Sequence, residues 1–345
     1  MSRRESALSY PRMAATPGID WRPLLGVLLL AIVGYAGKVA ASHVPHTEYV
    51  IFAIAFGMVI CNTIRIPAAL AWGIRTYEFW LRAGIVLMGA GLQWQNVLKI
   101  GATGLALIAV EILVAVFVAR VLARVFGLSE KLGSLMGVGV GICGVSAIIG
   151  ATGAIDARDE EAGYAIATVL IFGAIMVFLF PFLGKLMHLS DQAFGFWAGL
   201  SVDNTAETIA TGFAYSEGAG QVATLVKLSR NALMGFVILL FALYYAARGQ
   251  TREIADKAKF LWSRFPKFLL GFLALSLLSS AGFFTPTQVK TLTNLSKWFF
   301  MLTFAGVGLS LSLSRMKAGL KPFLVGLGVE SAVAIITLVL ILVFI

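Results

Sequence analysis

The chain has 345 residues, of which 59% are hydrophobic and only 13% charged, against about 25% charged residues in soluble domains. This composition excludes an ordinary soluble enzyme, and the long apolar runs are typical of a polytopic all-α membrane protein. The formal net charge is +10. Lys and Arg gather at the ends of the apolar runs, so they indicate topology and contacts with membrane lipid rather than nucleic acid.

Eleven apolar segments predict about 11 transmembrane helices. They cover residues 23–41, 48–64, 78–94, 101–123, 132–154, 162–187, 193–214, 221–247, 266–284, 295–313 and 322–344. We expect a cytoplasmic N-terminal tail (1–22) and a single transmembrane domain (23–345). Because about 22 residues precede the first segment, we interpret it as a span and not as a cleaved signal peptide, although "VAAS" at 39–42 leaves processing open.

The connections alternate between rich and poor in Lys and Arg. The tail and the connections after 48–64, 101–123, 221–247 and 295–313 are basic, whereas the loop "SHVPHTE" (42–48) has neither residue. Basic loops stay in the cytoplasm. The pattern therefore predicts a cytoplasmic N-terminus and a periplasmic or extracellular C-terminus.

The chain also contains an internal echo. "FWLRAGIVLMGAGLQ" (79–93) is similar to "WFFMLTFAGVGLSLS" (298–312), and each is followed by a glutamate in the next apolar segment, Glu111 and Glu330. The topology places the two copies in opposite orientations. This predicts an inverted repeat, as in many secondary transporters, with halves around 48–154 and 193–345. Chance similarity between glycine-rich helices is the alternative.

One apolar segment is unusually rich in glycine. "GSLMGVGVGICGVSAIIGATGA" (133–154) predicts close helix packing, a broken helix, or both. A break would free backbone N–H groups at the start of a half-helix, which attracts anions. The candidate anion-binding residues here are Gly141, Cys143, Gly144 and Ser146.

A polar stretch, "GLSVDNTAETIATG" (199–212), interrupts another apolar segment. Asp203, Glu207 and Thr211 are four residues apart, so on one continuous helix they would share a face. Acids at membrane depth are costly and usually functional. The candidate substrate- or ion-binding residues of this stretch are Asp203, Asn204, Thr205, Glu207 and Thr208.

The following segment supplies positive charge. In "QVATLVKLSRNALMG", Lys227, Arg230 and Asn231 fall on one helical face. We expect Lys227 and Arg230 to neutralise Asp203 and Glu207. A purely structural ion-pair network is the alternative.

The ordered motifs "GICGVSAI", "DNTAETIATG" and "VKLSRNALM" resemble the YeiH-like family, whose members carry the name sulfate exporter. The resemblance runs from about residue 48 to the end of the chain. It implies a transporter related to the bile acid, arsenite and riboflavin group, with a panel domain and a core domain of crossed, broken helices. It also implies a location in the bacterial inner membrane.

We therefore predict a secondary active transporter of a small anion, such as a sulfate- or sulfonate-like oxyanion or an organic acid, coupled to H⁺ or Na⁺. In this interpretation Gly141–Ser146 supply N–H groups, Lys227 and Arg230 the countercharge, and Asp203 and Glu207 the coupling site. No cofactor and no metal centre are expected, although Na⁺ at the two acids and a homodimer are left open. No GxxxxGK[ST] motif supports ATP-driven pumping.

Two alternatives remain. The first is an anion channel. The second is an intramembrane hydrolase with Ser146 as nucleophile, but the sequence places His43 and His46 in an exterior loop and His188 at the cytoplasmic end of a span, so none is positioned to activate the serine. Cys61 and Cys143 lie in apolar segments, and no disulfide is expected.

Overall fold

The computed structural model describes residues 22–45, 47–92, 101–251, 254–312 and 319–345. The predicted tail up to residue 21 and the basic residues Arg315 and Lys317 lie outside this part. The elements are α1 (Arg22–Ala41), α2 (Tyr49–Thr63), α3 (Ala68–Arg75), α4 (Tyr77–Met88), η1 (Gly89–Gly91), α6 (Gly101–Val125), α7 (Glu130–Val138), η2 (Gly139–Cys143), α8 (Val145–Ile155), α9 (Asp159–Leu186), α10 (Asp191–Ser201), α11 (Thr205–Tyr215), α12 (Glu217–Ala232), α13 (Met234–Ala247), α14 (Lys257–Arg264), α15 (Phe268–Ser280), α16 (Pro286–Ser310) and α17 (Leu320–Phe344).

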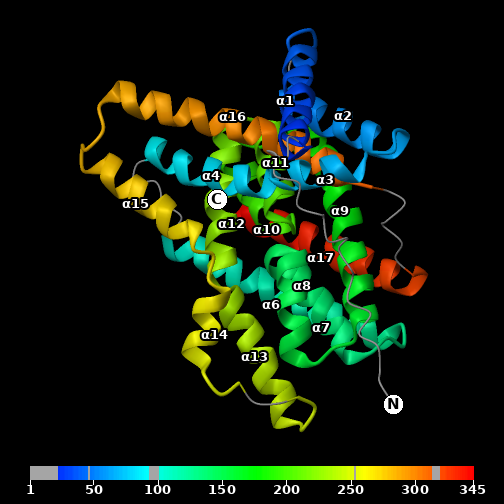
Figure 1. The fold of residues 1–345 in the computed structure, drawn as a ribbon. Coiled ribbons are helices and arrows are strands. Elements are labelled where there is room, and N and C mark those ends of the chain that lie inside the picture. The colour runs from blue at the N-terminus through cyan, green and yellow to red at the C-terminus, as the bar shows by residue number, and fades with distance from the viewer. Residues whose placement is uncertain (1–21, 46, 93–100, 252–253, 313–318) are drawn as a thin grey trace, which may run out of the picture.

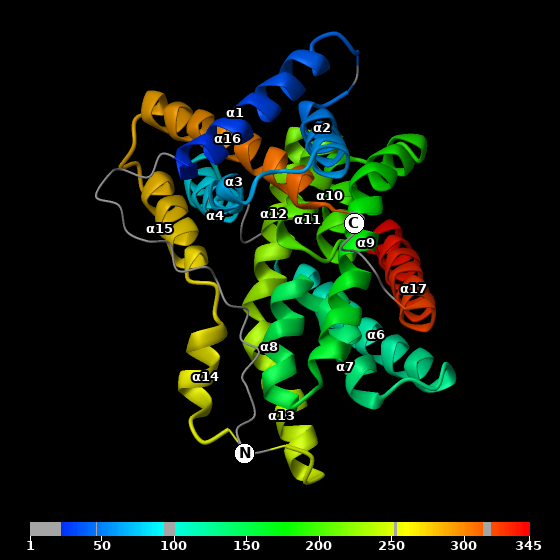
Figure 2. The ribbon, with the colours of Figure 1, turned by 45° about the vertical axis from the view of Figure 1, so that its right-hand side comes forward.

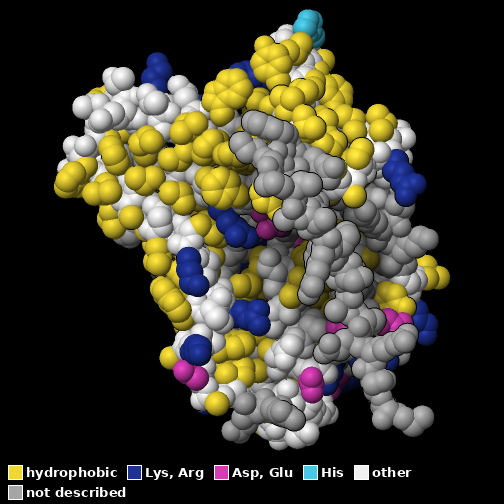
Figure 3. All heavy atoms as spheres, in the orientation of Figure 1, with side chains coloured by type: hydrophobic (Ala, Val, Ile, Leu, Met, Phe, Trp, Pro, Cys, Tyr) yellow, Lys and Arg dark blue, Asp and Glu magenta, His cyan; other side chains and the backbone are white. Residues whose placement is uncertain are grey.

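All elements in the described part of the chain are helices, which confirms the predicted all-α membrane class. Five stretches are long and apolar enough to cross a membrane, or six if the bent pair α14–α15 forms one span. Large apolar side chains on the outside of these helices are exposed, including Leu28 on α1, Phe117 on α6 and Phe182 on α9. Figure 3 shows such side chains covering the upper part of the molecule. These surfaces have the character of lipid-facing helices.

The helices form two bundles (Figures 1 and 2). In the scaffold bundle, α16 packs on α1, α2 and α4, while α15 packs on α4. In the core bundle, α6 packs on α7 and α17, and α12 packs on α10 and α11. The bundles meet where α11 contacts α2 and α16, and α14 lies against α13 of the core.

The glycine-rich segment does not run straight. Its helical geometry changes to a π turn at η2 and breaks at Gly144, whose φ of 62° and ψ of −123° suit glycine. The Nζ of Lys131, at the start of α7, donates to the carbonyl of Asp156, just after α8, over 2.7 Å. A continuous helix from 130 to 155 would separate these ends by roughly 39 Å. Therefore α7, η2 and α8 form a hairpin, which we call the first hairpin.

The polar stretch forms the turn of a second hairpin, made of α10 and α11. The chain is extended at Val202 and Asn204, and the side chain of Asn204 caps α11 by accepting from Ala206 N. The outer ends of both helices meet, because Ser216 Oγ donates to Asp191 Oδ1 over 2.7 Å and the rings of Phe194 and Tyr215 stack.

The two hairpins enter the core from opposite ends of α9. Ser129, at the opening of the first hairpin, donates to Glu161 at the start of α9. Tyr215, at the opening of the second, donates to the carbonyl of Leu189, just beyond the end of α9. A helix of 28 residues spans roughly 42 Å, so the openings lie on opposite faces of the molecule.

This arrangement corrects two sequence predictions. Segments 132–154 and 193–214 were expected to cross the membrane, but each turns back on itself. The expected placement of His43 and His188 on opposite faces is also wrong, since the two histidines line one cavity. A spanning helix and a hairpin of equal length can have the same composition. The apolar residues of a segment therefore could not tell one from the other.

Candidate functional site

The tips of the two hairpins meet in the middle of the core bundle. A Cβ atom built on Gly144 would lie 3.5 Å from the backbone nitrogen of Asn204. The break of the first hairpin therefore lies against the break of the second. The resemblance implied crossed, broken helices; both segments are broken, but each turns back as a hairpin.

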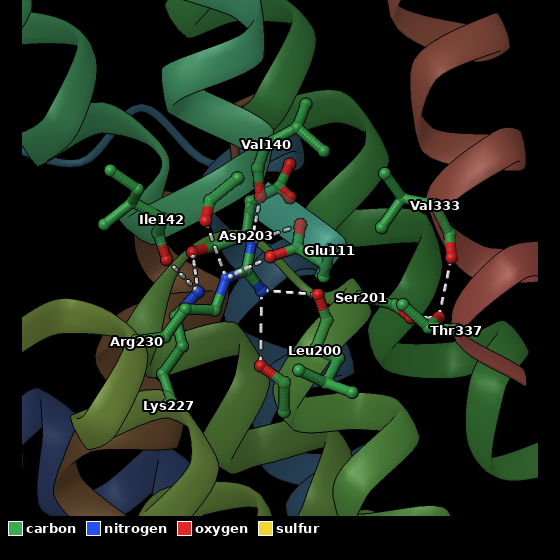
Figure 4. A network of polar contacts seen from close by, with 12 residues as sticks. Glu111, Val140, Ile142, Leu200, Ser201, Asp203, Lys227, Arg230, Val333 and Thr337 are labelled. Atoms are coloured by element: carbon green, nitrogen blue, oxygen red, sulfur yellow. Dashed lines mark hydrogen bonds and ion pairs between the residues drawn. The ribbon is translucent and has the colours of Figure 1, made fainter. Parts of the chain in front are cut away.

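Lys227, buried on α12, holds both tips together (Figure 4). Its ammonium group donates to the carbonyl of Ile142 over 2.7 Å in the first hairpin. In the second hairpin it donates to the carbonyl of Val202 over 2.9 Å and also to that of Asp203. These carbonyls lie at the C-terminal ends of helices, where the dipole is negative.

Arg230, one turn further along α12 and also fully buried, likewise donates hydrogen bonds to both tips. Its guanidinium donates to the carbonyls of Val140 and of Gly141 (2.9 Å) in the first hairpin. It also donates to those of Gly199 (3.2 Å) and Leu200 (2.6 Å) in the second. Its charge is met by Glu111 of α6, with Nε 3.1 Å from Oε2, and both side chains are fully buried.

These contacts correct the expected roles of the two cations. Arg230 pairs with Glu111 and not with Asp203 or Glu207, and Lys227 contacts the backbone of Asp203. The ammonium group of Lys227 and the guanidinium of Arg230 donate to backbone carbonyls near the helix breaks. These carbonyls lack intrahelical donors. The two cations are therefore capping groups of the hairpin tips, and among the described residues neither forms an ion pair with the carboxylate of Asp203 or Glu207.

The acids of the polar stretch also separate. Asp203 lies in the tip, before α11 begins, so Asp203, Glu207 and Thr211 do not share a helical face. The Asp203 carboxyl lies within hydrogen-bonding reach of Glu330 on α17. Glu207 packs against α9, where a Cβ at Gly173 would lie 1.8 Å from its Oε2. The hydroxyl of Thr208 donates to the carbonyl of Val202 and braces the tip.

A cavity of about 510 Å³ opens on the other side of the tips, between the core and the scaffold. The beginnings of α8 and α11 line it, and the first N–H groups of a helix have no intrahelical acceptor. Its core wall is formed by the hairpin residues Cys143, Val145, Ser146, Asn204, Thr205 and Ala206, with Asn231 of α12 and Met234 of α13. Two helix N-termini therefore face one space, which is favourable for an anion.

Asn231 of α12 is a polar residue that lines this cavity. Its side-chain Nδ2 donates to Thr205 Oγ1 over 2.9 Å, whereas its Oδ1 has no hydrogen-bond partner among the described residues. The residue is 6% exposed. An unpaired amide oxygen in so buried a position indicates a place where a water or a hydroxyl group of a ligand donates the missing hydrogen bond.

The predicted site residues thus divide into two groups. The cavity group is Cys143, Ser146, Asn204, Thr205 and Asn231. The buried network behind the tips holds Gly141, Asp203, Glu207, Thr208, Lys227, Arg230, Glu111 and Glu330, and Gly144 lies between the two groups.

The opposite wall of the cavity contains charged residues that the sequence interpretation missed. Arg82 and Glu78 of α4 line it, paired to each other over 3.2 Å, together with Lys267 before α15. The signal for Arg82 was present, since it is the one basic residue inside the apolar segment 78–94.

Within the described ranges, no group of three or more His, Cys, Asp or Glu residues could hold a metal ion. His43 and His188 line a cavity at the outer end of the second hairpin, with Glu48 and Lys185, and Ser146 is not among its lining residues. His46 lies outside the described residues.

The sequence of this chain is similar to those of a known protein family. The model of the family described as "Conserved hypothetical protein 698" matches residues 24–326. The chain belongs to this family. Relatives named UPF0324 membrane protein include one from Nitratidesulfovibrio vulgaris, 37% identical over 299 residues, which are 85% of this chain and 83% of the relative. Another, from Clostridium tetani, is 30% identical over 91% of this chain and 95% of its own length.

The names of these relatives describe membrane proteins and state no activity. Together with the apolar helices, the family membership establishes a multi-pass membrane protein. Because the family match begins at residue 24 and ends at residue 326, it includes both hairpins and the cavity between the bundles.

Proposed function

We propose that this protein is a secondary active transporter of a small anion, and that the anion binds in the cavity at the hairpin tips. The observation that carries the proposal is the convergence of two helix N-termini, those of α8 and α11, on a cavity that Asn231 also lines. Helix N-termini, hydroxyl groups and the second N–H of the Asn231 amide, whose other N–H is donated to Thr205, are donors of the kind that recognise oxyanions.

The size and charge of the cavity favour a small ligand. Its volume, about 510 Å³, is at the lower end of ligand-binding pockets. Ser146 and Thr205 offer hydroxyl groups from the core, and Arg82 and Lys267 offer positive charge from the far wall. A sulfate- or sulfonate-like oxyanion or a short organic acid fits this chemistry. The sulfate-exporter name of the resembled family points in the same direction.

The position of the cavity supports alternating access. Its two walls belong to different bundles, and the core wall consists of hairpin tips that enter from opposite faces. Movement of the core against the scaffold would open the cavity to one face and then the other. Broken helices at the midplane are the usual substrate site of secondary transporters, often within inverted repeats. The predicted repeat, with Glu111 and Glu330 as equivalent acids, remains part of this proposal.

The proposed orientation is a cytoplasmic N-terminus and a periplasmic C-terminus in the bacterial inner membrane. The face at the first hairpin's opening carries Lys131, Arg158 and Arg248, whereas the loop 42–48 on the other face has neither Lys nor Arg. Removing two crossings from eleven leaves an odd number, so the termini stay on opposite sides.

An anion channel is the second candidate, because the same cavity could pass ions without coupling. Gradient-dependent, saturable uptake separates the two. An intramembrane hydrolase is supported less, because neither of the described histidines lines the cavity of Ser146.

Uptake by proteoliposomes containing the purified protein tests the proposal. We expect saturable uptake of sulfate, a sulfonate or a small organic acid that depends on an H⁺ or Na⁺ gradient. Asn231→Ala should raise KM about tenfold, since hydrogen bonds to charged groups contribute about 1.5–3 kcal/mol. Asn294→Ala, an exposed amide on α16, is the control and should change nothing. Equal uptake by both variants would contradict the assignment of the cavity.

A further inference from the structure

The tip of the second hairpin contacts α17 through two acids. Asp203 and Glu330 are 0% and 2% exposed, and their carboxyl groups lie within hydrogen-bonding reach of each other. None of their four carboxyl oxygens accepts a hydrogen bond from a donor in the described part of the chain. Within the described part of the chain, the hydrogen-bonding contact of each carboxyl group is therefore with the other carboxyl group.

Two ionised carboxylates cannot make this contact. Both are acceptors, and two like charges in a low-dielectric interior repel strongly. Such a pair is stable when one proton lies between the oxygens, so that one acid donates to the other. The geometry thus requires a bound proton or another cation.

The surrounding charges agree with this requirement. The groups that act on the pair are Glu111 from α6, Glu207 from α11, and Lys227 and Arg230 from α12, with the neutral thiol of Cys143 also near Asp203. Glu111, Asp203 and Glu330 would carry three negative charges against two positive ones. One proton on the pair makes these five groups neutral; Glu207, which packs against Gly173, is not one of the five.

A proton suits this position better than Na⁺. A metal cation needs several oxygen ligands. The backbone oxygens of Val202 and Asp203, in the same tip, already accept hydrogen bonds from the ammonium group of Lys227. That ammonium group would also repel a second cation.

We propose that Asp203 and Glu330 share one proton, and that this proton fastens the tip of the second hairpin to α17. Asp203 directly precedes Asn204, which caps α11 and lines the anion cavity. Loss of the proton leaves two facing charges and loosens the wall of the cavity. The coupling of protons to anions rests on the proposed function, whereas the proton site does not.

Hydrogen–deuterium exchange of the purified protein, without any substrate, tests the proton site. After correction for the intrinsic pH dependence, exchange of residues 199–206 should be constant at low pH. It should rise by up to about tenfold per pH unit above the ordinary pKa of a free carboxyl, where the closed tip still holds the proton that the open tip has lost. A tip whose corrected exchange is constant between about pH 5 and about pH 9 would overturn the proposal, since buried carboxyls titrate within that range.

Three variants locate the group. Glu330→Gln and Asp203→Asn each place a neutral amide donor against the remaining acid, and either should abolish the rise. If one of them fails to fold, the other gives the same information. Glu207→Gln, a buried acid of the same hairpin, is the matched control and should keep the rise. A rise that survives in Glu330→Gln, or that vanishes only in Glu207→Gln, would refute the assigned pair.

Exchange in sodium chloride and in choline chloride at one alkaline pH separates a proton from Na⁺. Equal exchange is expected, and protection of the tip by Na⁺ that Glu330→Gln removes would overturn the proton assignment. Failure of the proposed function gives a different result. In that case the pH-dependent rise is intact, but no anion is taken up by proteoliposomes at any pH.

Discussion

Among single residues, Arg230 and Lys227 decide how the core is held together. Their N–H groups donate hydrogen bonds to carbonyls of both hairpin tips, and Arg230 also forms an ion pair with Glu111. A charged side chain in a membrane protein is usually read as a substrate ligand. Here the two cationic side chains instead donate hydrogen bonds to the broken helices, because the carbonyl groups at the helix ends lack intrahelical donors.

Replacement of Arg230 should therefore damage the fold more than the binding site. Arg230→Met strands Glu111 and leaves carbonyls of both tips without donors. We expect a loss of about 3–5 kcal/mol, as for other broken buried ion pairs. Thermal unfolding in detergent measures it. Arg82→Met, a cation of the opposite cavity wall, is the control, and its exposed pair with Glu78 should contribute less than about 1 kcal/mol.

Glu207 depends on the absence of a side chain at Gly173. A methyl group there would overlap the Glu207 carboxyl, with a Cβ–Oε2 distance of 1.8 Å. Gly173→Ala should cost about 1–3 kcal/mol through overpacking. Gly163→Ala on the same helix has no neighbour within 4 Å of its Cβ and should be neutral. If both variants unfold at the same temperature, the contact of Glu207 with α9 is wrong.

At the scale of the element, Gly144 determines the break of the first hairpin. The added Cβ would meet only ordinary contacts, but φ of 62° is unfavourable for any other residue. Gly144→Ala should thus destabilise by about 1–3 kcal/mol through backbone strain alone. Gly153→Ala in α8, where nothing lies within 4 Å, should be neutral or stabilise by up to about 1 kcal/mol. Equal unfolding temperatures for the two variants would argue against a break at Gly144.

The sequence predicted where helices lie better than where they cross. Each of the eleven apolar segments contains a helix, and the broken helix, one of the two features predicted for the glycine-rich segment 133–154, is present at Gly144. The break at 202–204 was missed because an i, i+4 spacing of acids looks like one helical face. Asn204, a good N-cap residue within an apolar run, was the available signal.

At the scale of the molecule, the structure brings the predicted site residues together but pairs them differently from the prediction. All three motifs converge on the hairpin tips. The partner of Arg230 could not be predicted, because Glu111 lies 119 positions away in the sequence. The division between a buried network and a cavity is likewise a property of three-dimensional packing. It follows from which side of each broken helix presents carbonyls and which presents N–H groups.

The central claim is that two hairpins enter the core from opposite faces and meet at the candidate site. Single cysteines at four exposed positions, introduced after replacement of Cys61 and Cys143, test it most directly with a membrane-impermeant thiol reagent on oriented vesicles. The positions are Arg124 and Asp159, flanking the first hairpin, and Gln192 and Glu217, flanking the second. We predict that Arg124→Cys and Asp159→Cys react from one side of the membrane, and that Gln192→Cys and Glu217→Cys react from the other. Labelling of the two members of either pair from opposite sides would show that the segment between them spans the membrane and would contradict the hairpin architecture.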